Sequence, residues 1–236
     1  MAALPAPAVG KHTGTIFERP PSHRRPAVVA PCTVQRSPQE TAVHPSLTTL
    51  LDELAAFGDA HDGDAANRAT RMLNITPDTG AFLALLVKAT GARRILEIGT
   101  SNAYSTLWLA DAATATGGMV TTVELAPAKV AMARNNVARA GLQAVVDQRE
   151  GDAGALLANL DDGAFDLLFL DSQRSAYLAW WPHIKRVLRA GGLLVVDNAT
   201  SHAHEMAEFM DAVRGDAGFT VSLVPVGKGE FLAVKA

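Results

Sequence analysis

Three oxygen-bearing side chains follow apolar segments in the second half of the chain. Asp171 ends the segment FDLLFLD (165–171), and Asp197 and Asn198 end GLLVVDN (192–198). If these segments are neighbouring parallel strands, the three side chains converge at one edge of a sheet. Two adjacent carboxylates repel each other unless a proton or a metal intervenes, and carboxylate and amide oxygens suit a hard divalent ion such as Mg²⁺. The pattern predicts a metal site; the alternative is a set of strand-end residues that only cap loops.

A second stretch, EIGTSNAYS (97–105), follows the apolar run RRIL. A strand that runs into a tight turn and a helix is typical of a site for a nucleotide-like ligand. The dinucleotide fingerprint needs three glycines, however, and only Gly99 is present. Glu97 would also repel a phosphate at about 4 Å by roughly 1 to 4 kcal/mol. The stretch therefore argues against NAD.

A cationic ligand turns the charge of Glu97 into an attraction. S-adenosylmethionine carries a sulfonium and an ammonium group and has no phosphate. Glu124 stands near the end of the next strand-like segment, MVTTVEL (119–125), where an acid can accept hydrogen bonds from ribose hydroxyls. Glu97 and Glu124 together favour an adenosyl cofactor with a positive amino-acid end, the alternative being two solvent-facing acids.

From residue 93 onward, strand-like segments alternate with helix-like segments. These elements must position the acids and the asparagine described above. Strands are expected over 93–99, 119–125, 144–150, 165–171 and 192–198, with helices near 103–113, 127–140, 153–160, 175–189 and 203–214. The segments 219–226 and 230–236 flank GKG and predict an antiparallel hairpin at one edge. The expected fold class is α/β: a Rossmann-like, doubly wound, mostly parallel seven-stranded sheet with helices on both faces.

Helical patterns precede the first strand. SLTTLLDELAAFG repeats apolar residues at helical spacing, and DAANRATRML predicts a second short helix. Thr76 and Pro77 are expected to be the N-cap and first residue of a helix that ends at Gly91. Residues 44–91 are thus interpreted as N-terminal helices and 92–236 as the Rossmann-like core of one domain, 44–236.

The N-terminal segment 1–43 has a different composition. Eight of the twelve prolines lie within residues 1–45, and residues 1–39 hold five Lys or Arg against one acid. We interpret 1–43 as a disordered tail, with an organellar transit peptide or an over-extended translation start as alternatives. The single cysteine, Cys32, has no partner for an internal disulfide, which fits a reducing compartment.

The net charge and the length of the apolar runs indicate which kinds of partner are not expected. The net charge of −3 gives no sign of a nucleic-acid-binding surface. No apolar run approaches the roughly 18 to 20 residues that span a bilayer, so we expect no membrane partner and a cytoplasmic protein.

The ordered set of motifs resembles a known family. RRILEIGTSNAYSTLWLA is similar to the first motif of class I S-adenosylmethionine-dependent methyltransferases, in particular the metal-dependent O-methyltransferases that include the catechol and caffeoyl-CoA enzymes. The resemblance runs from about Leu47 to the C-terminus. The matching pieces are NITPDTG, EIG followed by YS, Glu124, EGDA (150–153), FDLLFLD and GGLLVVDN (191–198).

The resemblance implies transfer of a methyl group from S-adenosylmethionine to a small hydroxylated, catecholic or phenolic acceptor with help from Mg²⁺ or a similar ion. Glu97 and Gly99 would line the methionine end of the cofactor, Ser105 would bind its carboxylate and Glu124 its ribose. The resemblance further assigns Asp152 and Ala153 to the adenine, Ile75 to a segment that folds over the cofactor, Asp171 to the cofactor as well as the metal, and Asp197 and Asn198 to the metal. Resembling bacterial and plant enzymes are commonly homodimers.

Two positions depart from the family pattern. Ala103 stands where the family has glycine, so we expect the backbone there to avoid a positive φ angle. Arg174 stands where the family often has a lysine that takes the substrate proton, and an arginine stays protonated. We therefore expect the metal to lower the hydroxyl pKa and Arg174 to act as an electrostatic clamp, the alternative being a surface arginine without a substrate contact.

Other residues and functions stay open. His202 and His204 are interpreted as ordinary loop histidines, and Tyr177, Trp180 and Trp181 as packing or partner-surface residues. The alternatives to a metal-dependent enzyme are a metal-independent methyltransferase acting on another small metabolite and a catalytically lapsed S-adenosylmethionine-binding module.

Overall fold

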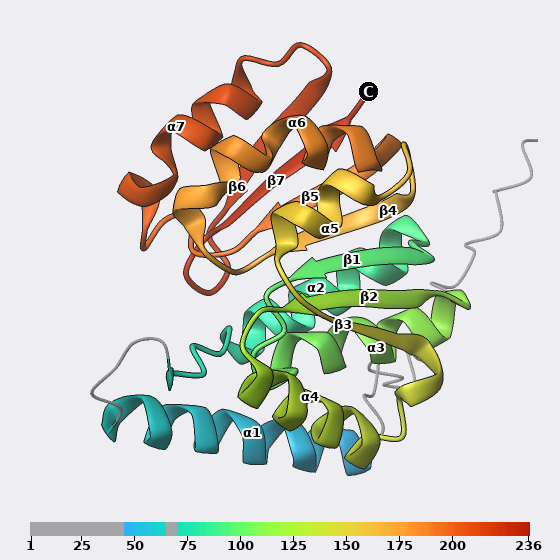
Figure 1. Ribbon diagram of the computed structural model, residues 1–236, viewed down its shortest axis with the longest axis vertical. Helices are drawn as coiled ribbons and strands as arrows, with labels where there is room; N and C mark the ends of the chain where they lie inside the picture. The colour runs from blue at the N-terminus through green and yellow to red at the C-terminus, as the bar shows by residue number, and fades with distance from the viewer. Residues whose placement is uncertain (1–44, 65–69) are drawn as a thin grey trace, which may run out of the picture. The chain divides into compact units, whose positions relative to one another are not determined.

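The computed structural model describes residues 45–64 and 70–236, so the predicted tail 1–43 lies outside the described part. Seven strands form one sheet in the order β3-β2-β1-β4-β5-β7-β6 (Figure 1). The strands are β1 (Arg94–Ile98), β2 (Met119–Glu124), β3 (Val146–Glu150), β4 (Phe165–Leu170), β5 (Leu188–Val196), β6 (Phe219–Val224) and β7 (Glu230–Lys235). The first five are parallel, and β7 pairs antiparallel with β5 and β6. The predicted fold class, with its C-terminal hairpin at one edge, is confirmed.

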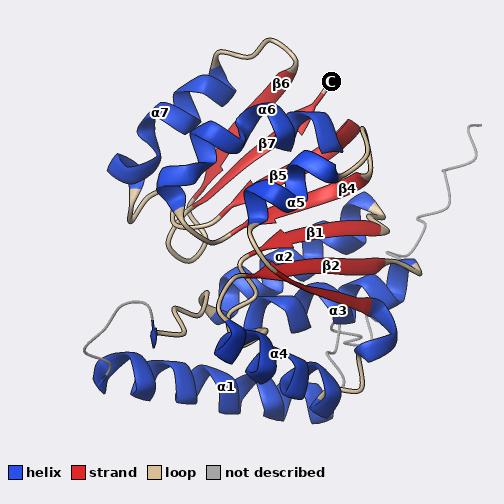
Figure 2. Cartoon of the chain, in the orientation of Figure 1, coloured by secondary structure: helices blue, strands red, loops and turns tan. Residues whose placement is uncertain are grey.

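Helices cover both faces of the sheet (Figure 2). They are α1 (Pro45–Asp64), α2 (Pro77–Thr90), α3 (Tyr104–Thr116), α4 (Pro127–Arg139), α5 (Ala153–Asn159), α6 (Tyr177–Val187) and α7 (Ala203–Arg214). Helices α2 to α4 cover one face, with α1 packed on α3 on the same side, and α5 to α7 cover the other face. None of the described helices is long and apolar enough to cross a membrane.

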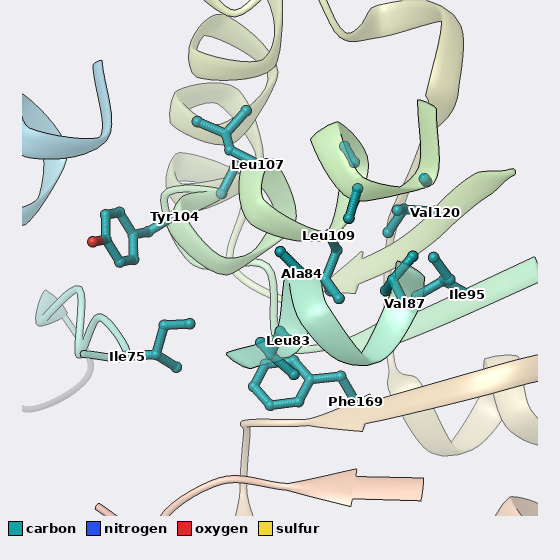
Figure 3. Close-up of a cluster of buried hydrophobic side chains, with 14 of the residues drawn as sticks. Ile75, Leu83, Ala84, Val87, Ile95, Tyr104, Leu107, Leu109, Val120 and Phe169 are labelled. Atoms are coloured by element: carbon teal, nitrogen blue, oxygen red, sulfur yellow. The ribbon is translucent and has the colours of Figure 1, made fainter. Parts of the chain in front are cut away.

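Two hydrophobic cores lie on opposite sides of the sheet because successive strand side chains point to opposite faces. Ile95 belongs to the core under α1 to α4, which Figure 3 shows around Leu83, Leu107 and Phe169. Its neighbour Leu96 belongs to the core under α5 to α7. Strands that are apolar on both faces are therefore explained by this two-sided burial.

The start and end of α2 follow the sequence signals. The Thr76 hydroxyl accepts a hydrogen bond from the Thr79 N–H, Pro77 is the first helical residue, and Gly91 ends the helix at φ 63°. The glycine is required there because the left-handed conformation disfavours a side chain. This predicted helix is confirmed.

The second short helix, expected over 64–73, falls mostly on residues 65–69, which lie outside the described part. Helix α1 continues to Asp64, Thr70 is in a 3-10 turn, and the chain is irregular from residue 71 to residue 76. The carboxylate of Asp62 accepts hydrogen bonds from the backbone N–H groups of Met72 (2.6 Å) and Leu73 (2.7 Å). Leu73 is also in the left-handed region at φ 54°. These contacts turn the chain away from a helix and toward α2.

The carboxyl ends of the central strands extend the sheet ladder into the following loops. The N–H of Gly99 donates to the Val123 carbonyl, that of Asp171 to Ile98, and that of Asp197 to Leu170. The residues directly after β1, β4 and β5 are thereby held side by side. Strand order reverses at β1, where ligands bind in open α/β sheets.

Candidate active site

A cavity of about 930 Å³ opens at this edge of the sheet. Its size falls in the range of small-molecule sites, roughly 300 to 1,000 Å³. Most of the residues predicted to form a site line it: Ile75, Gly99, Ser105, Glu124, Asp152, Ala153, Asp171, Arg174 and Asn198. The structure therefore brings together residues that are spread over more than a hundred positions of the sequence. Glu97 and Asp197 lie behind this lining rather than in it.

Gly99 is required by a close backbone approach. A Cβ atom at this position would lie 2.0 Å from the carbonyl oxygen of Asp171, and the φ angle of 104° disfavours any side chain. The single glycine of EIGTSNAYS thus lets the loops after β1 and β4 touch. It explains why this glycine is present although the three-glycine fingerprint is not.

The expectation for Ala103 is wrong: its backbone adopts the positive φ angle of 72°. The N–H of Ala103 donates to the Thr100 carbonyl at 2.8 Å, and its own carbonyl accepts from Leu107 at 3.0 Å in the first turn of α3. Its methyl group is fully buried. These hydrogen bonds hold a conformation that costs an alanine roughly 1 to 2 kcal/mol. The loop therefore has the geometry that a glycine would adopt, with strain added.

Glu97 is buried beneath this loop. Its carboxylate accepts hydrogen bonds from the hydroxyl groups of Ser105, Thr106 and Thr122. Burial raises the pKa of Glu97 to about 7, although the three hydroxyl donors oppose the shift. Glu97 reaches the cavity only through Ser105, whose side chain lies at the cavity wall.

Two buried donors at the cavity wall have no hydrogen-bond partner in the described part of the chain. They are Asn102 Nδ2 and Ser172 Oγ. Buried polar groups rarely go unpaired, so both atoms are suited to bind a polar ligand. Sequence reasoning missed both residues, since an asparagine and a serine beside tight turns are also common as local caps.

Two further acids, Glu124 and Asp152, line the part of the cavity next to α5. Glu124 accepts hydrogen bonds from the N–H groups of Ser101 and Ala126, both at 2.9 Å. Asp152 caps α5 by accepting from the Ala155 N–H at 2.8 Å. Acceptor capacity remains on both carboxylates, because each oxygen can accept more than one hydrogen bond.

Trp180 lines the cavity beside α5, so its interpretation as only a packing or partner-surface residue is wrong. A Cβ atom on Gly154 would lie 2.7 Å from Trp180 Nε1, so the indole rests against the first turn of α5. Tyr177 and Trp181 instead pack in the core, as interpreted. The three rings are close in sequence, but the orientation of α6 directs Trp180 to the cavity and Tyr177 and Trp181 to the core.

The predicted metal ligands form one cluster. Asn198 Nδ2 lies 3.4 Å from Asp171 Oδ1 and also contacts Asp197 Oδ2. Asn198 takes the left-handed φ of 67°, which directs its side chain back to the two acids. Asp197 and Asn198 are buried, and Asp171 faces the cavity.

The electrostatics of the cluster are unfavourable for two free carboxylates. Burial and the neighbouring Asp197 raise the pKa of Asp171 to about 8. Burial also raises the pKa of Asp197. Carboxylates that are pushed toward their neutral forms in this way favour a bound proton or a divalent cation.

Glu230, at the start of β7, is a third acid that the sequence analysis missed. Burial and the charge of Asp197 raise the pKa of Glu230 to about 10, so this carboxyl group is protonated near neutral pH. Its Oε1 accepts from the Thr79 hydroxyl at 3.1 Å, and a proton on Oε2 can be donated to Asp197. The available signal was an acid that directly precedes an apolar strand segment, FLAV.

A divalent cation fits this cluster. Among the described residues, no three His, Cys, Asp or Glu side chains gather as a metal site, so an amide must complete the donor set. Asp171, Asp197 and Asn198 supply two carboxylates and an amide, the hard oxygen donors that Mg²⁺ prefers. The Asn198 amide must turn so that its oxygen faces the site, because its nitrogen faces the acids here.

Comparison with known proteins decides the family. Residues 49–236 match the family model described as O-methyltransferase. The chain belongs to the class I S-adenosylmethionine-dependent O-methyltransferases.

Relatives of this O-methyltransferase include two named catechol O-methyltransferases. One, from Niastella koreensis, is 37% identical over 160 residues, which cover 65% of this chain and 72% of the relative. The other, from Mycobacterium tuberculosis, is 36% identical over 165 residues, which cover 70% of this chain and 74% of the relative.

Solved structures resemble this methyltransferase along most of its length. The Bacillus cereus O-methyltransferase in complex with SAH has a TM-score of 0.67 and 26% identity, covering 80% of this chain and 91% of that one. The Streptomyces achromogenes O-methyltransferase TomG, in complex with SAM, also has a TM-score of 0.67 and 26% identity, covering 83% and 91%.

Charged side chains gather at the cavity end of the methyltransferase that adjoins the acid cluster. Arg174 is buried, and its Nε donates to Glu205 Oε2 at 2.8 Å. His202 lines the cavity, and its Nδ1 lies 2.9 Å from Ser201 Oγ. Arg174 is thus neither a surface residue nor an isolated cation, because it forms an ion pair at the cavity wall.

Proposed function

We propose that this enzyme moves the methyl group of S-adenosylmethionine to a hydroxyl group of a small catecholic or phenolic acceptor, assisted by Mg²⁺ or a similar ion. The cluster of Asp171, Asp197 and Asn198 at the cavity edge carries the proposal. Burial raises the pKa values of both carboxylates, and the charge of Asp197 raises that of Asp171 further, so a divalent cation would stabilise their charged forms. The names of the two catechol O-methyltransferase relatives support the acceptor class.

The cofactor would occupy the cavity from Ser105 to α5. Its methionine end would lie by Gly99 and Ser105, with the buried carboxylate of Glu97 behind Ser105 favouring a positive charge. The unpartnered donors of Asn102 and Ser172 are suited to the methionine carboxylate or other polar cofactor atoms. The helix α3 begins beside Ser105, and a helix N-terminus stabilises an anion.

The adenosyl end would extend toward α5. Glu124 would accept hydrogen bonds from the ribose hydroxyls, and Asp152 and Ala153 would border the adenine together with Trp180. Ile75, which is buried at the cavity wall, would cover the cofactor.

The acceptor would bind between the cofactor and the acid cluster. A bound divalent cation would lower the pKa of an acceptor hydroxyl and so favour the nucleophilic oxyanion. Glu230, held protonated by burial and by the charge of Asp197, would keep Asp197 oriented through a hydrogen bond. Arg174 is always protonated and is paired with Glu205, so it would stabilise negative charge rather than take a proton.

The direct test is a methyl-transfer assay on the full chain with a panel of catechols and single phenols. We expect turnover of catechols with Mg²⁺, a loss of about a hundredfold or more in EDTA, and recovery when Mg²⁺ is restored. Asp171→Ala should abolish the metal-dependent rate. Asp147→Ala, which removes an exposed acid paired with Arg149, is the matched control and should retain it.

Separate outcomes would reject separate parts of the proposal. Full activity of Asp171→Ala in EDTA would contradict the metal assignment and favour a metal-independent methyltransferase. Binding of S-adenosylmethionine in calorimetry without turnover of any acceptor would favour a lapsed binding module.

A further inference from the structure

Lys228, in the loop between β6 and β7, differs from the other basic side chains at the cavity. Lys129 Nζ donates to the Arg71 carbonyl at 2.6 Å, and Arg174 is paired with Glu205. The Lys228 ammonium lines the same cavity but forms no hydrogen bond or ion pair within residues 45–64 and 70–236. It is therefore a cation that is available to a ligand.

The backbone around Lys228 is held firmly on both sides. Its carbonyl accepts hydrogen bonds from the N–H groups of Thr200 (3.2 Å) and Ser201 (3.1 Å), just after the predicted metal ligand Asn198. A Cβ atom on Gly227 would lie 2.1 Å from Thr79 Oγ1, and one on Gly229 would lie 2.0 Å from Thr200 Oγ1. The two glycines thus allow the loop to pack closely against α2 and the loop after β5, which places Lys228 beside the acid cluster.

The charge of Lys228 acts on the acceptor end of the cavity. It lowers the pKa values of Asp171 and Asp197 against the effect of their burial. With a divalent cation balancing those two carboxylates and Glu205 balancing Arg174, the charge of Lys228 remains uncompensated. An anionic group on the acceptor would balance it.

The lining of this end is polar. Gln173, Arg174, His202 and Glu205 line the cavity together with Lys228; Arg174 pairs with Glu205, and the His202 N–H donates to the carbonyl of Asn198 in the acid cluster. The aromatic ring of Trp180 instead lies beside α5. The acceptor end is therefore suited to hydrogen bonds and ion pairs, which select a charged substituent more strongly than a plain aromatic ring.

We infer that Lys228 binds the carboxylate of an acidic acceptor, so that the preferred substrates are catechols that carry a carboxylate substituent. This inference rests on the proposed function, because it assumes that the two hydroxyl groups face the acid cluster. Lys228 would determine specificity rather than take part in the methyl transfer.

Binding to the complex with S-adenosylhomocysteine and Mg²⁺ tests the inference without turnover. Calorimetry would compare 3,4-dihydroxybenzoate with 4-methylcatechol, which has a similar shape but no charge. We expect wild type to bind the acid more tightly by roughly tenfold, the range of a hydrogen-bonded charge pair. Lys228→Met should lose this preference and leave 4-methylcatechol affinity unchanged, while Lys228→Arg should retain it.

Lys88→Met is the control, because it removes the same charge from the last turn of α2, away from the cavity lining. It should keep the preference of wild type. Equal affinity of wild type for both compounds, or an equal loss of both in Lys228→Met, would overturn the inference while leaving the proposed function intact. If neither compound binds and no catechol is methylated, the proposed function itself is wrong.

Discussion

Asp166 and Asp171 lie at opposite ends of strand β4 and have opposite electrostatic surroundings. Burial tends to raise the pKa of Asp166, but hydrogen bonds from Arg93 and Arg94, followed by those from Arg189, outweigh it and lower that pKa to about 2. Burial and the repulsion of Asp197 raise the pKa of Asp171 to about 8. The same residue type is thus stabilised as an anion at one end of the sheet and destabilised at the other.

Backbone strain follows the same division. Around the cavity at the carboxyl end, positive φ angles occur at four described residues with side chains, Leu73 (54°), Ser101 (48°), Ala103 (72°) and Asn198 (67°), in addition to glycines such as Gly99. At the amino end, near Asp166, the positive φ angles belong to glycines, Gly117 and Gly163. Strain and unpaired charge concentrate where a ligand would bind, since such features persist only when the surrounding fold holds them. The amino end of the sheet therefore holds an acid whose charge is stabilised, and the carboxyl end is where we propose that the ligands bind.

Replacing each aspartate with asparagine should distinguish an acid needed for activity from one needed for stability. The largest effect is expected for Asp171. We expect Asp171→Asn to lower the methyl-transfer rate by about a hundredfold or more, since a proposed metal ligand is lost. In EDTA its stability should match or exceed that of wild type, because a repelled carboxylate is removed. Rates with Mg²⁺ and thermal unfolding with EDTA would check both points. If Asp171→Asn kept a methyl-transfer rate near that of wild type, Asp171 would be no more important for activity than Asp166, and the proposed difference between the two acids would be wrong.

Asp166→Asn should have the reverse effect. The lowered pKa of Asp166 corresponds to about 2 kcal/mol of stability near neutral pH, which the amide would lose. Denaturant unfolding at pH 7 measures this loss, and the rate of the folded variant should stay close to that of wild type.

The pH dependence of the free energy of unfolding should distinguish the two acids, because their charges contribute to stability with opposite signs. A depressed folded-state pKa stabilises above the unfolded value of 3.8, and the contribution is lost as pH falls through about 2. Asp171, whose folded-state pKa is raised, makes the metal-free protein less stable as pH rises from about 4 to about 8. Both variants should therefore approach wild type at low pH, where each aspartate is protonated, and depart from it in opposite directions as pH rises. Asp166→Asn should become less stable than wild type above about pH 4, and metal-free Asp171→Asn should become more stable than wild type toward pH 8. A difference between Asp166→Asn and wild type that persists unchanged below pH 2 would show that the charge is not responsible.

The smallest expected effect concerns strain at the carboxyl end. Ala103→Gly should stabilise the protein by about 0.5 to 1 kcal/mol, because relief of the left-handed alanine exceeds the added freedom of the unfolded glycine. Ala115→Gly, at an exposed position of the same helix α3, should instead destabilise it by up to about 1 kcal/mol. Equal losses in both variants would mean that Ala103 is not strained.

Much of this arrangement could be predicted from local sequence. The alternation of apolar segments and turns predicted the seven strands and their direction, and the acids that end two segments predicted the cluster of Asp171, Asp197 and Asn198. These predictions succeed because parallel strands bring their carboxyl ends to one edge. The roles of individual residues toward cofactor and metal stay predictions, as do the homodimer, the cytoplasmic location and the domain boundary at residue 44.

Other features could not be found in this way. Glu230 lies close to Asp197 only because β7 pairs with β5. Lys228 reaches the cavity only because its own loop, between β6 and β7, packs against α2. Glu97 was expected at the cavity but is covered by three hydroxyl groups from β2 and α3.

The sequence by itself determined the order of elements, the family and which strand ends carry acids, because hydrophobic periodicity and turn residues act over a few neighbouring positions. Only the tertiary structure decided the charge state of those acids and the conformation of Ala103. A pKa depends on burial and on charges brought close by packing, and a backbone angle at a loop depends on hydrogen bonds from both sides of the loop. These depend on distances in space, which local sequence patterns do not contain.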